Sequence, residues 1–84
     1  MIYRQGDVVI QEAIVPSDVK EKADGVIALG ESTGHAHRVK SGGKLFVAPN
    51  TTIYLKAYSP TTISHEEHGD IILPAGEYQM KCIS

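Results

Sequence analysis

Short runs of β-branched and aromatic residues, separated by Gly, Pro, Asn and Ser, dominate this chain of 84 residues. No segment repeats apolar residues at helical spacing over three turns, whereas several alternate apolar and polar residues as half-buried strands do. We therefore expect an all-β protein that forms a single small domain over residues 1–84. The predicted strands are Asp7–Val15, Val26–Glu31, Ala36–Lys40, Lys44–Ala48, Thr52–Tyr58, Thr61–His65, Asp70–Leu73 and Glu77–Ile83.

The connections in the middle of the chain are short and consist of turn-forming residues. "SGG", "PNT" and "SP" separate four successive predicted strands between residues 36 and 65, and such sequences favour tight hairpin turns. These four strands are therefore predicted to form an up-and-down antiparallel meander. The polar segment at residues 16–25 is predicted to be a solvated loop.

All four histidines of the chain lie in two tight pairs, His35 with His37 in "GHAHR" and His65 with His68 in "SHEEHGD". Residues two apart on a strand share a face, so His35 and His37 can direct both rings at one point. His65 and His68 need the chain to turn, for which Gly69 is suited. Successive strands of the meander run in opposite directions, so the first strand begins and the fourth strand ends at the same end of the sheet. Both pairs are therefore predicted to lie at that end.

The two pairs are too far apart in a flat meander to share one ion. The first and fourth strands would be separated by about 14 Å. Either the sheet curls, or the pairs meet across a subunit interface. We expect curling, because the remaining strands must also pack and small β proteins often close their sheets to remove edges. The predicted fold is a small β-barrel or a barrel-like sandwich built around the antiparallel meander.

A divalent transition-metal site formed by the two pairs is the first functional hypothesis, because neutral imidazole is the commonest metal ligand. Zn is the expected ion, with Ni, Fe and Cu as alternatives. Four protein ligands would make the site structural, whereas three ligands and a water would leave a reactive position. Glu66 and Glu67, between the histidines of the second pair, could be ligands, orient a ring or act as a general base. For catalytic roles the candidates are Glu67 and Arg38.

Two further classes of function remain open. In the second, the histidines act without metal as acid and base on a phosphodiester or similar substrate, while Arg38 stabilises the developing charge. In the third, the protein is a non-catalytic assembly or binding module, of a kind that a phage could encode. The histidines would then be surface or interface groups whose contacts respond to pH.

Composition restricts the partners of the protein. Eight Lys and Arg against ten Asp and Glu give a formal charge of −2, which provides no basic surface for nucleic acid. The single cysteine, Cys82, cannot form an internal disulfide. No stretch approaches the roughly 18 apolar residues of a membrane span. We expect a cytoplasmic protein whose partner is a metal ion, with an unidentified small-molecule substrate if it is an enzyme and with homo-oligomerisation compatible with its small core.

The segments "GHAHR" and "HEEHGDIILPAGEY" resemble a group of small, uncharacterised bacterial and phage proteins in which GHxH is followed by HxEH and an LPxGxY ending. The resemblance covers residues 34–78 discontinuously. It implies that the two histidine pairs belong together, and it brings no established activity.

The HxH segment also resembles cupins, small β-barrels whose first motif carries HxH and whose second carries a further histidine, together binding a metal. His35 and His37 would match the first motif, and His65 or His68 the second. The chain departs from the cupin pattern because no glutamate follows HxH, and because "LPAG" comes after the second pair rather than before it. The resemblance thus implies a metal inside a β-barrel without implying an activity. The segments "GDVVI" and "GVIALGE" are similar to the co-chaperonin barrel, which has no matching histidine site.

Overall fold

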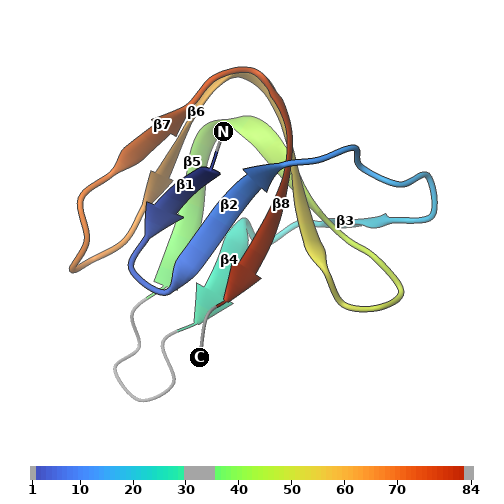
Figure 1. Cartoon of the computed structure of the whole chain (residues 1–84), viewed down its shortest axis with the longest axis horizontal. Coiled ribbons are helices and arrows are strands. Elements are labelled where there is room, and N and C mark those ends of the chain that lie inside the picture. Colours follow the sequence, from blue (N-terminus) through green and yellow to red (C-terminus); the bar gives the residue numbers. More distant parts are fainter. Residues whose placement is uncertain (1, 30–35, 83–84) are drawn as a thin grey trace.

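A computed structural model describes residues 2–29 and 36–82 of the chain. This part of the chain is all-β, as predicted, and its strands form an antiparallel sheet (Figure 1). The strands are β1 (Ile2–Gln5), β2 (Val8–Glu12), β3 (Lys20–Lys22), β4 (Val26–Leu29), β5 (Ala36–Val47), β6 (Ile53–Ser64), β7 (Ile71–Leu73) and β8 (Gly76–Cys82). Their order is β1-β2-β8-β6-β5-β3, with β4 paired to β5 and β7 paired to β6. Within the described ranges, no helix has the length and apolar character needed to cross a membrane.

The two longest strands, β5 and β6, have 12 residues each and form one hairpin. The predicted "PNT" turn joins them. The Thr51 amide donates a hydrogen bond to the Ala48 carbonyl at 2.8 Å. The Thr52 amide donates to Asn50 Oδ1 at 3.1 Å. The Asn side chain thus closes the turn as this residue type commonly does.

The predicted turns at "SGG" and "SP" are wrong, because both segments lie inside continuous strands. The pairing of β5 with β6 shifts register between Val39 and Ser41 and again between Ser41 and Gly43. Such irregularities bend a strand without ending it. Gly42 has a φ of 88°, and a Cβ placed there would lie 2.6 Å from the Pro60 carbonyl oxygen. The turn-forming residues therefore mark a bend, and the four strands predicted for the meander are the halves of one hairpin.

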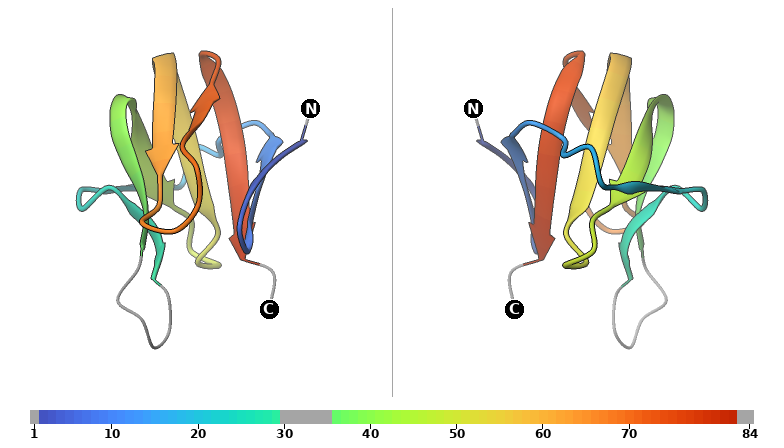
Figure 2. Two further views of the ribbon diagram at one scale, coloured as in Figure 1. Left: turned by 90° about the vertical axis from the view of Figure 1, so that its left-hand side faces the viewer. Right: turned by 90° about the vertical axis from the view of Figure 1, so that its right-hand side faces the viewer.

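The bend gives each half of the hairpin different neighbours. The first half of β6 pairs with β8 and its second half with β7. β5 pairs with β4 near its start and with β3 near its end. The resulting sheet is strongly curved, and Figure 2 shows β1 and β2 on one side of the molecule and β5 on the other, with β8 and β6 between them. The sheet is not closed, so the description as barrel-like is only approximate.

The core lies inside this curve and receives side chains from β2, β4, β5, β6, β7 and β8. Its buried members are Val8, Ile10, Ile27, Leu45, Leu55, Ala57, Ile63, Leu73, Tyr78 and Met80. The alternation predicted for the last strand is confirmed at Tyr78 and Met80, which are buried while Glu77 is exposed. Tyr78 also donates a hydrogen bond from its hydroxyl to the Pro74 carbonyl at 2.6 Å, so its polar end is satisfied inside the core.

Two short strands were not predicted. β1 precedes the first predicted strand and is joined to β2 by a two-residue turn whose first residue, Gly6, has a φ of 59°. β3 lies within residues 16–25, so the prediction of a loop throughout this segment is wrong at Lys20–Lys22. Both strands stand at the ends of the sheet order, where one side of the strand lacks a neighbour and polar residues are tolerated. The ends of two predicted strands, at residues 30–31 and 83, lie outside the described residues.

Candidate histidine site

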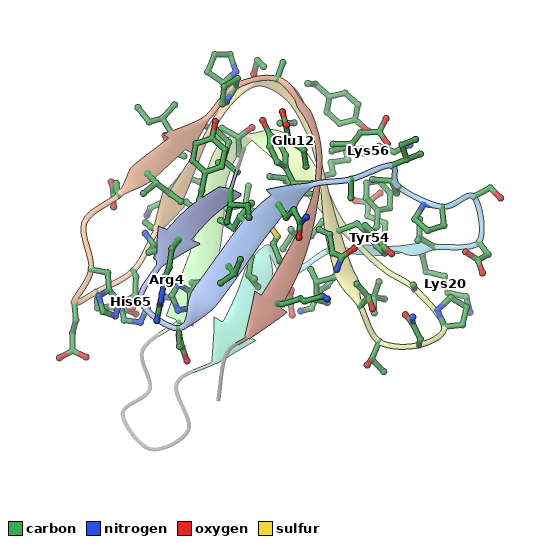
Figure 3. All side chains as sticks on the ribbon, viewed as in Figure 1. Arg4, Glu12, Lys20, Tyr54, Lys56 and His65 are labelled. Carbon is green, nitrogen blue, oxygen red and sulfur yellow. The ribbon has the colours of Figure 1, made fainter. Side chains whose placement is uncertain are left out.

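Three of the four histidines predicted as metal ligands lie close together in the structure, namely His37, His65 and His68. Arg38 in β5 pairs with Ser64 in β6, so His37 and His65 lie side by side at the open end of the bent hairpin. The ring centroids are 4.4 Å apart for His37 and His65, 4.5 Å for His65 and His68, and 6.2 Å for His37 and His68. Figure 3 labels His65 at this end of the molecule. His35 lies outside the described residues.

The route by which the segments meet differs from the prediction. Three tight turns were expected to return the chain to its starting end, leaving about 14 Å between the first and fourth strands. Because β5 and β6 are single continuous strands that pair directly, one turn suffices and the segments belong to neighbouring strands. Neither a closed barrel nor a subunit interface is needed for the contact between His37 and His65.

His37 is the buried member of the cluster, with an exposed fraction of only 2%. Both of its ring nitrogens have oxygen partners. Nδ1 lies 2.9 Å from Gln5 Oε1, and Nε2 lies 3.0 Å from Asp7 Oδ1. The two partners flank the turn between β1 and β2, so this turn is positioned against the start of β5.

Gln5 bridges the part of the curved sheet that does not close. Its side-chain amide is buried and donates from Nε2 to the Ile63 carbonyl at 3.0 Å and to the Gly69 carbonyl at 2.9 Å. One side chain of β1 thereby contacts β5, the end of β6 and the turn that carries His68. The sequence prediction missed Gln5. Once β1 is recognised, alternation along "IYRQ" places Tyr3 and Gln5 on one face, which is the only sequence signal for an inward-facing amide.

Asp7 is the second residue that sequence reasoning missed. Its side chain is 63% exposed, and its contact with the buried His37 ring is made from the solvent side. The hydrogen bond from His37 lowers the pKa of the Asp7 carboxyl below its usual value. The carboxylate is therefore the favoured form of Asp7 in this contact, which supports a negative charge at the exposed edge of the cluster.

The second histidine pair lies on the turn between β6 and β7, as the sequence predicted for "HEEHGD". The Glu67 amide donates a hydrogen bond to His65 Nδ1 at 3.0 Å. The His68 ring covers Gly6, where an added Cβ would lie 2.6 Å from His68 Cδ2. Gly6 therefore has two reasons to be glycine, its positive φ and the ring packed against it.

Glu66 fastens this turn to the start of β5. Its carboxylate accepts hydrogen bonds from the Ala36 amide at 3.0 Å and from Arg38 Nη1 at 2.9 Å. The bond from the Ala36 amide is the largest cause of a pKa lowered from 4.5 to about 2, and the Arg38 guanidinium adds to it. The predicted catalytic candidate Arg38 is thus engaged in an ion pair, and Glu67 lies on the exposed part of the turn.

The ring nitrogens are not arranged around a common point. Among residues 2–29 and 36–82, no group of three or more His, Cys, Asp or Glu side chains is placed so that it could hold a metal ion. The contacts described above account for this. His37 Nε2 is directed at Asp7, His65 Nδ1 accepts from the Glu67 amide, and the His68 ring lies against Gly6.

Comparison with known proteins identifies the family. No curated protein and no solved structure has significant similarity to the chain. A family model described as a domain of unknown function, DUF8820, matches residues 4–82. This range includes Gln5, Asp7 and both histidine pairs. The chain therefore belongs to the DUF8820 family.

Proposed function

We propose that this domain binds a divalent transition-metal ion through its histidine cluster, with Zn as the expected ion and Ni, Fe and Cu as alternatives. The observation that carries the proposal is the gathering of three imidazole rings from two distant segments, with centroids 4.4–6.2 Å apart. The predicted ligand His35 remains in the proposed set, because it stands two residues before His37 in a strand-forming sequence.

The spacing of the rings fits a shared ion. A metal–nitrogen bond of about 2.0–2.1 Å places each imidazole centroid about 3 Å from the ion, and hence centroids about 5 Å from one another in a tetrahedral site. The observed separations lie on both sides of this value. No group of three ligands is so placed among the described residues, so binding also requires the rings to turn until their nitrogens face one point.

Binding requires two contacts of the metal-free arrangement to change. Asp7 must move away from His37 Nε2 or become a ligand itself, and its exposed side chain is free of core packing that would oppose this. His65 can bind through Nδ1, or through Nε2 with Nδ1 protonated. Nδ1 is then either metal-bound or a donor, so both choices give up the bond from the Glu67 amide. The likeness of the HxH segment to cupins supports the same function. Whether the site is structural or catalytic depends on how many protein ligands it has.

Metal-free acid–base catalysis is the second candidate function, and the pairing of His37 Nε2 with Asp7 Oδ1 favours it. A carboxylate beside an imidazole stabilises the protonated ring and orients it for proton transfer. In that reaction Glu67 would be the further base, and Arg38 would have to exchange Glu66 for the substrate. The substrate would be a phosphodiester or a similar small molecule.

Elemental analysis of untagged protein distinguishes the two candidates. We expect close to one equivalent of transition metal per chain after expression in metal-replete medium, and its loss in His37→Ala and His65→Ala. Asp18→Asn is a suitable control, because it removes an exposed carboxylate from the loop before β3. Metal-free wild-type protein that cleaves a phosphodiester with a bell-shaped pH profile would instead support the second candidate.

A further inference from the structure

We infer that Gln5 is a positioning residue that fixes the tautomer of His37, so that the ring keeps its proton on Nδ1 and offers only Nε2 to an ion. The part of this inference that concerns the ion rests on the proposed function. The tautomer itself does not depend on metal binding.

The orientation of the Gln5 amide follows from its surroundings. Its Nε2 lies 3.0 Å from the Ile63 carbonyl oxygen and 2.9 Å from the Gly69 carbonyl oxygen. An amide nitrogen carries two hydrogens, and each has one acceptor here. If the amide were turned over, Oε1 would face two carbonyl oxygens without any donor between them. With Gln5 only 2% exposed, no solvent could compensate.

A fixed amide dictates which His37 nitrogen carries the proton. Gln5 Oε1 can only accept a hydrogen bond, and it lies 2.9 Å from His37 Nδ1. Nδ1 must therefore be the donor. The Asp7 carboxylate, 3.0 Å from Nε2, can also only accept a hydrogen bond, so the protonated ring serves both partners. The neutral ring has one proton for the two acceptors. Asp7 is 63% exposed and can be solvated, whereas Gln5 is buried and has no other donor for Oε1, so the proton stays on Nδ1 and Nε2 is unprotonated. This is the arrangement in which a metal-binding histidine is held by a second partner through its other ring nitrogen.

The same amide also sets the direction of approach. His37 is buried, whereas Asp7, the partner of Nε2, is 63% exposed. The nitrogen that Gln5 leaves unprotonated is thus the one at the solvent side of the ring. Through Gly69, Gln5 is also tied to the turn that carries His68, so one side chain orients His37 and holds the second histidine segment beside it.

Nitrogen-15 NMR of the metal-free, full-length wild-type protein tests the tautomer directly. Long-range proton–nitrogen correlations at a pH where the ring is neutral, assigned by comparison with His37→Ala, report which ring nitrogen carries the proton. We expect a single tautomer with the proton on Nδ1. A proton on Nε2, or a mixture of the two forms, would overturn the inference.

Gln5→Met provides the matched variant, because it retains the length of the side chain and removes all three hydrogen bonds. We expect its His37 to populate both tautomers, and its Zn²⁺ affinity to fall about 10–100-fold, the usual effect of losing a partner that orients a ligand. A variant that folds, retains the single Nδ1–H tautomer and binds Zn²⁺ like the wild type would contradict the role of Gln5. Should the variant not fold, the wild-type spectrum still decides.

The two proposals can fail separately. Wild-type protein with the Nδ1–H tautomer but no affinity for Zn²⁺, Ni²⁺, Cu²⁺ or Fe²⁺ would refute the metal-binding function and leave the role of Gln5 in place. Wild-type protein that binds an ion while His37 is protonated on Nε2 in the metal-free state would refute the role of Gln5 and leave the metal-binding function in place.

Discussion

Arg38 and Ser64 are direct partners across β5 and β6, and this pairing places His37 beside His65. The two histidine segments are thus neighbours because of the register of one bent hairpin. Anything that shifts this register by one residue would turn the side chains of a strand to its other face. The bend and the contacts at the open end of the hairpin are therefore the features on which the site depends.

Gly6→Ala should displace the His68 ring. The positive φ and the contact with the ring both oppose a side chain at this position, and we expect the free energy of unfolding to fall by about 1–3 kcal/mol. Gly25→Ala is the matched control, since Gly25 has a similar positive φ of 68° and an added Cβ there meets only the Val39 carbonyl oxygen at 3.7 Å. Urea denaturation measures both. Equal stabilities of the two variants would contradict the packing of His68 on Gly6.

The bend in the hairpin can be tested at Gly42. Gly42→Ala combines a positive φ with a close approach to the Pro60 carbonyl, whereas Gly25→Ala has a similar φ and meets only the Val39 carbonyl at 3.7 Å. Backbone strain should lower the free energy of unfolding of both variants by about 1–3 kcal/mol. The decrease should be larger for Gly42→Ala, because its Cβ also clashes with the Pro60 carbonyl oxygen. Urea denaturation again provides the comparison. A smaller decrease in the free energy of unfolding for Gly42→Ala than for Gly25→Ala would contradict the close approach of β5 to β6 at Gly42.

Much of this fold could be predicted from the sequence, because strand-forming runs and the "PNT" turn act locally. The errors occur where a local signal has two structural meanings. Gly42 and Pro60 are typical of turns, but they are equally typical of a bend or bulge within a strand. Only the pairing of the distant residues on either side distinguishes these cases. The edge strands β1 and β3 carry few apolar residues, and so their pattern is weak.

Glu66 should make the stability depend on pH in the acid range. Its pKa in the folded protein is about 2, below the ordinary 4.5. Its contribution to the free energy of unfolding is therefore complete above pH 4.5. The contribution is lost as the pH falls towards 2, because the carboxylate must be protonated. Glu66→Gln retains an acceptor for the Ala36 amide without this titration, and should show a weaker dependence between pH 4.5 and 2 in urea denaturation.

Glu21→Gln serves as the control for this experiment. Glu21 is an exposed carboxylate in β3, away from the histidine turn. Its removal should leave the acid dependence close to that of the wild type. An unchanged pH profile in Glu66→Gln would mean that Glu66 does not hold the turn against β5 in solution.

Only part of the candidate site could be predicted from the sequence. The two histidine pairs stand out by their spacing, so a prediction that they meet required only the direction of the strands. Gln5 and Asp7 could not be found in this way, because their contacts with His37 join residues about thirty positions apart. Their role depends on the curvature of the sheet, which carries β1 towards the end of β6.

A Zn²⁺ titration of a double-mutant cycle tests most directly whether the two histidine segments share one ion. Calorimetry would compare the wild type, His37→Ala, His65→Ala and the double variant. If one ion is shared, each single substitution should weaken Zn²⁺ binding at least 10-fold. The double variant should lose much less binding free energy than the sum of the two single losses, because removing one ligand already disrupts the site to which the other belongs. Strictly additive losses, or a wild-type protein that does not bind Zn²⁺, Ni²⁺, Cu²⁺ or Fe²⁺, would contradict the account.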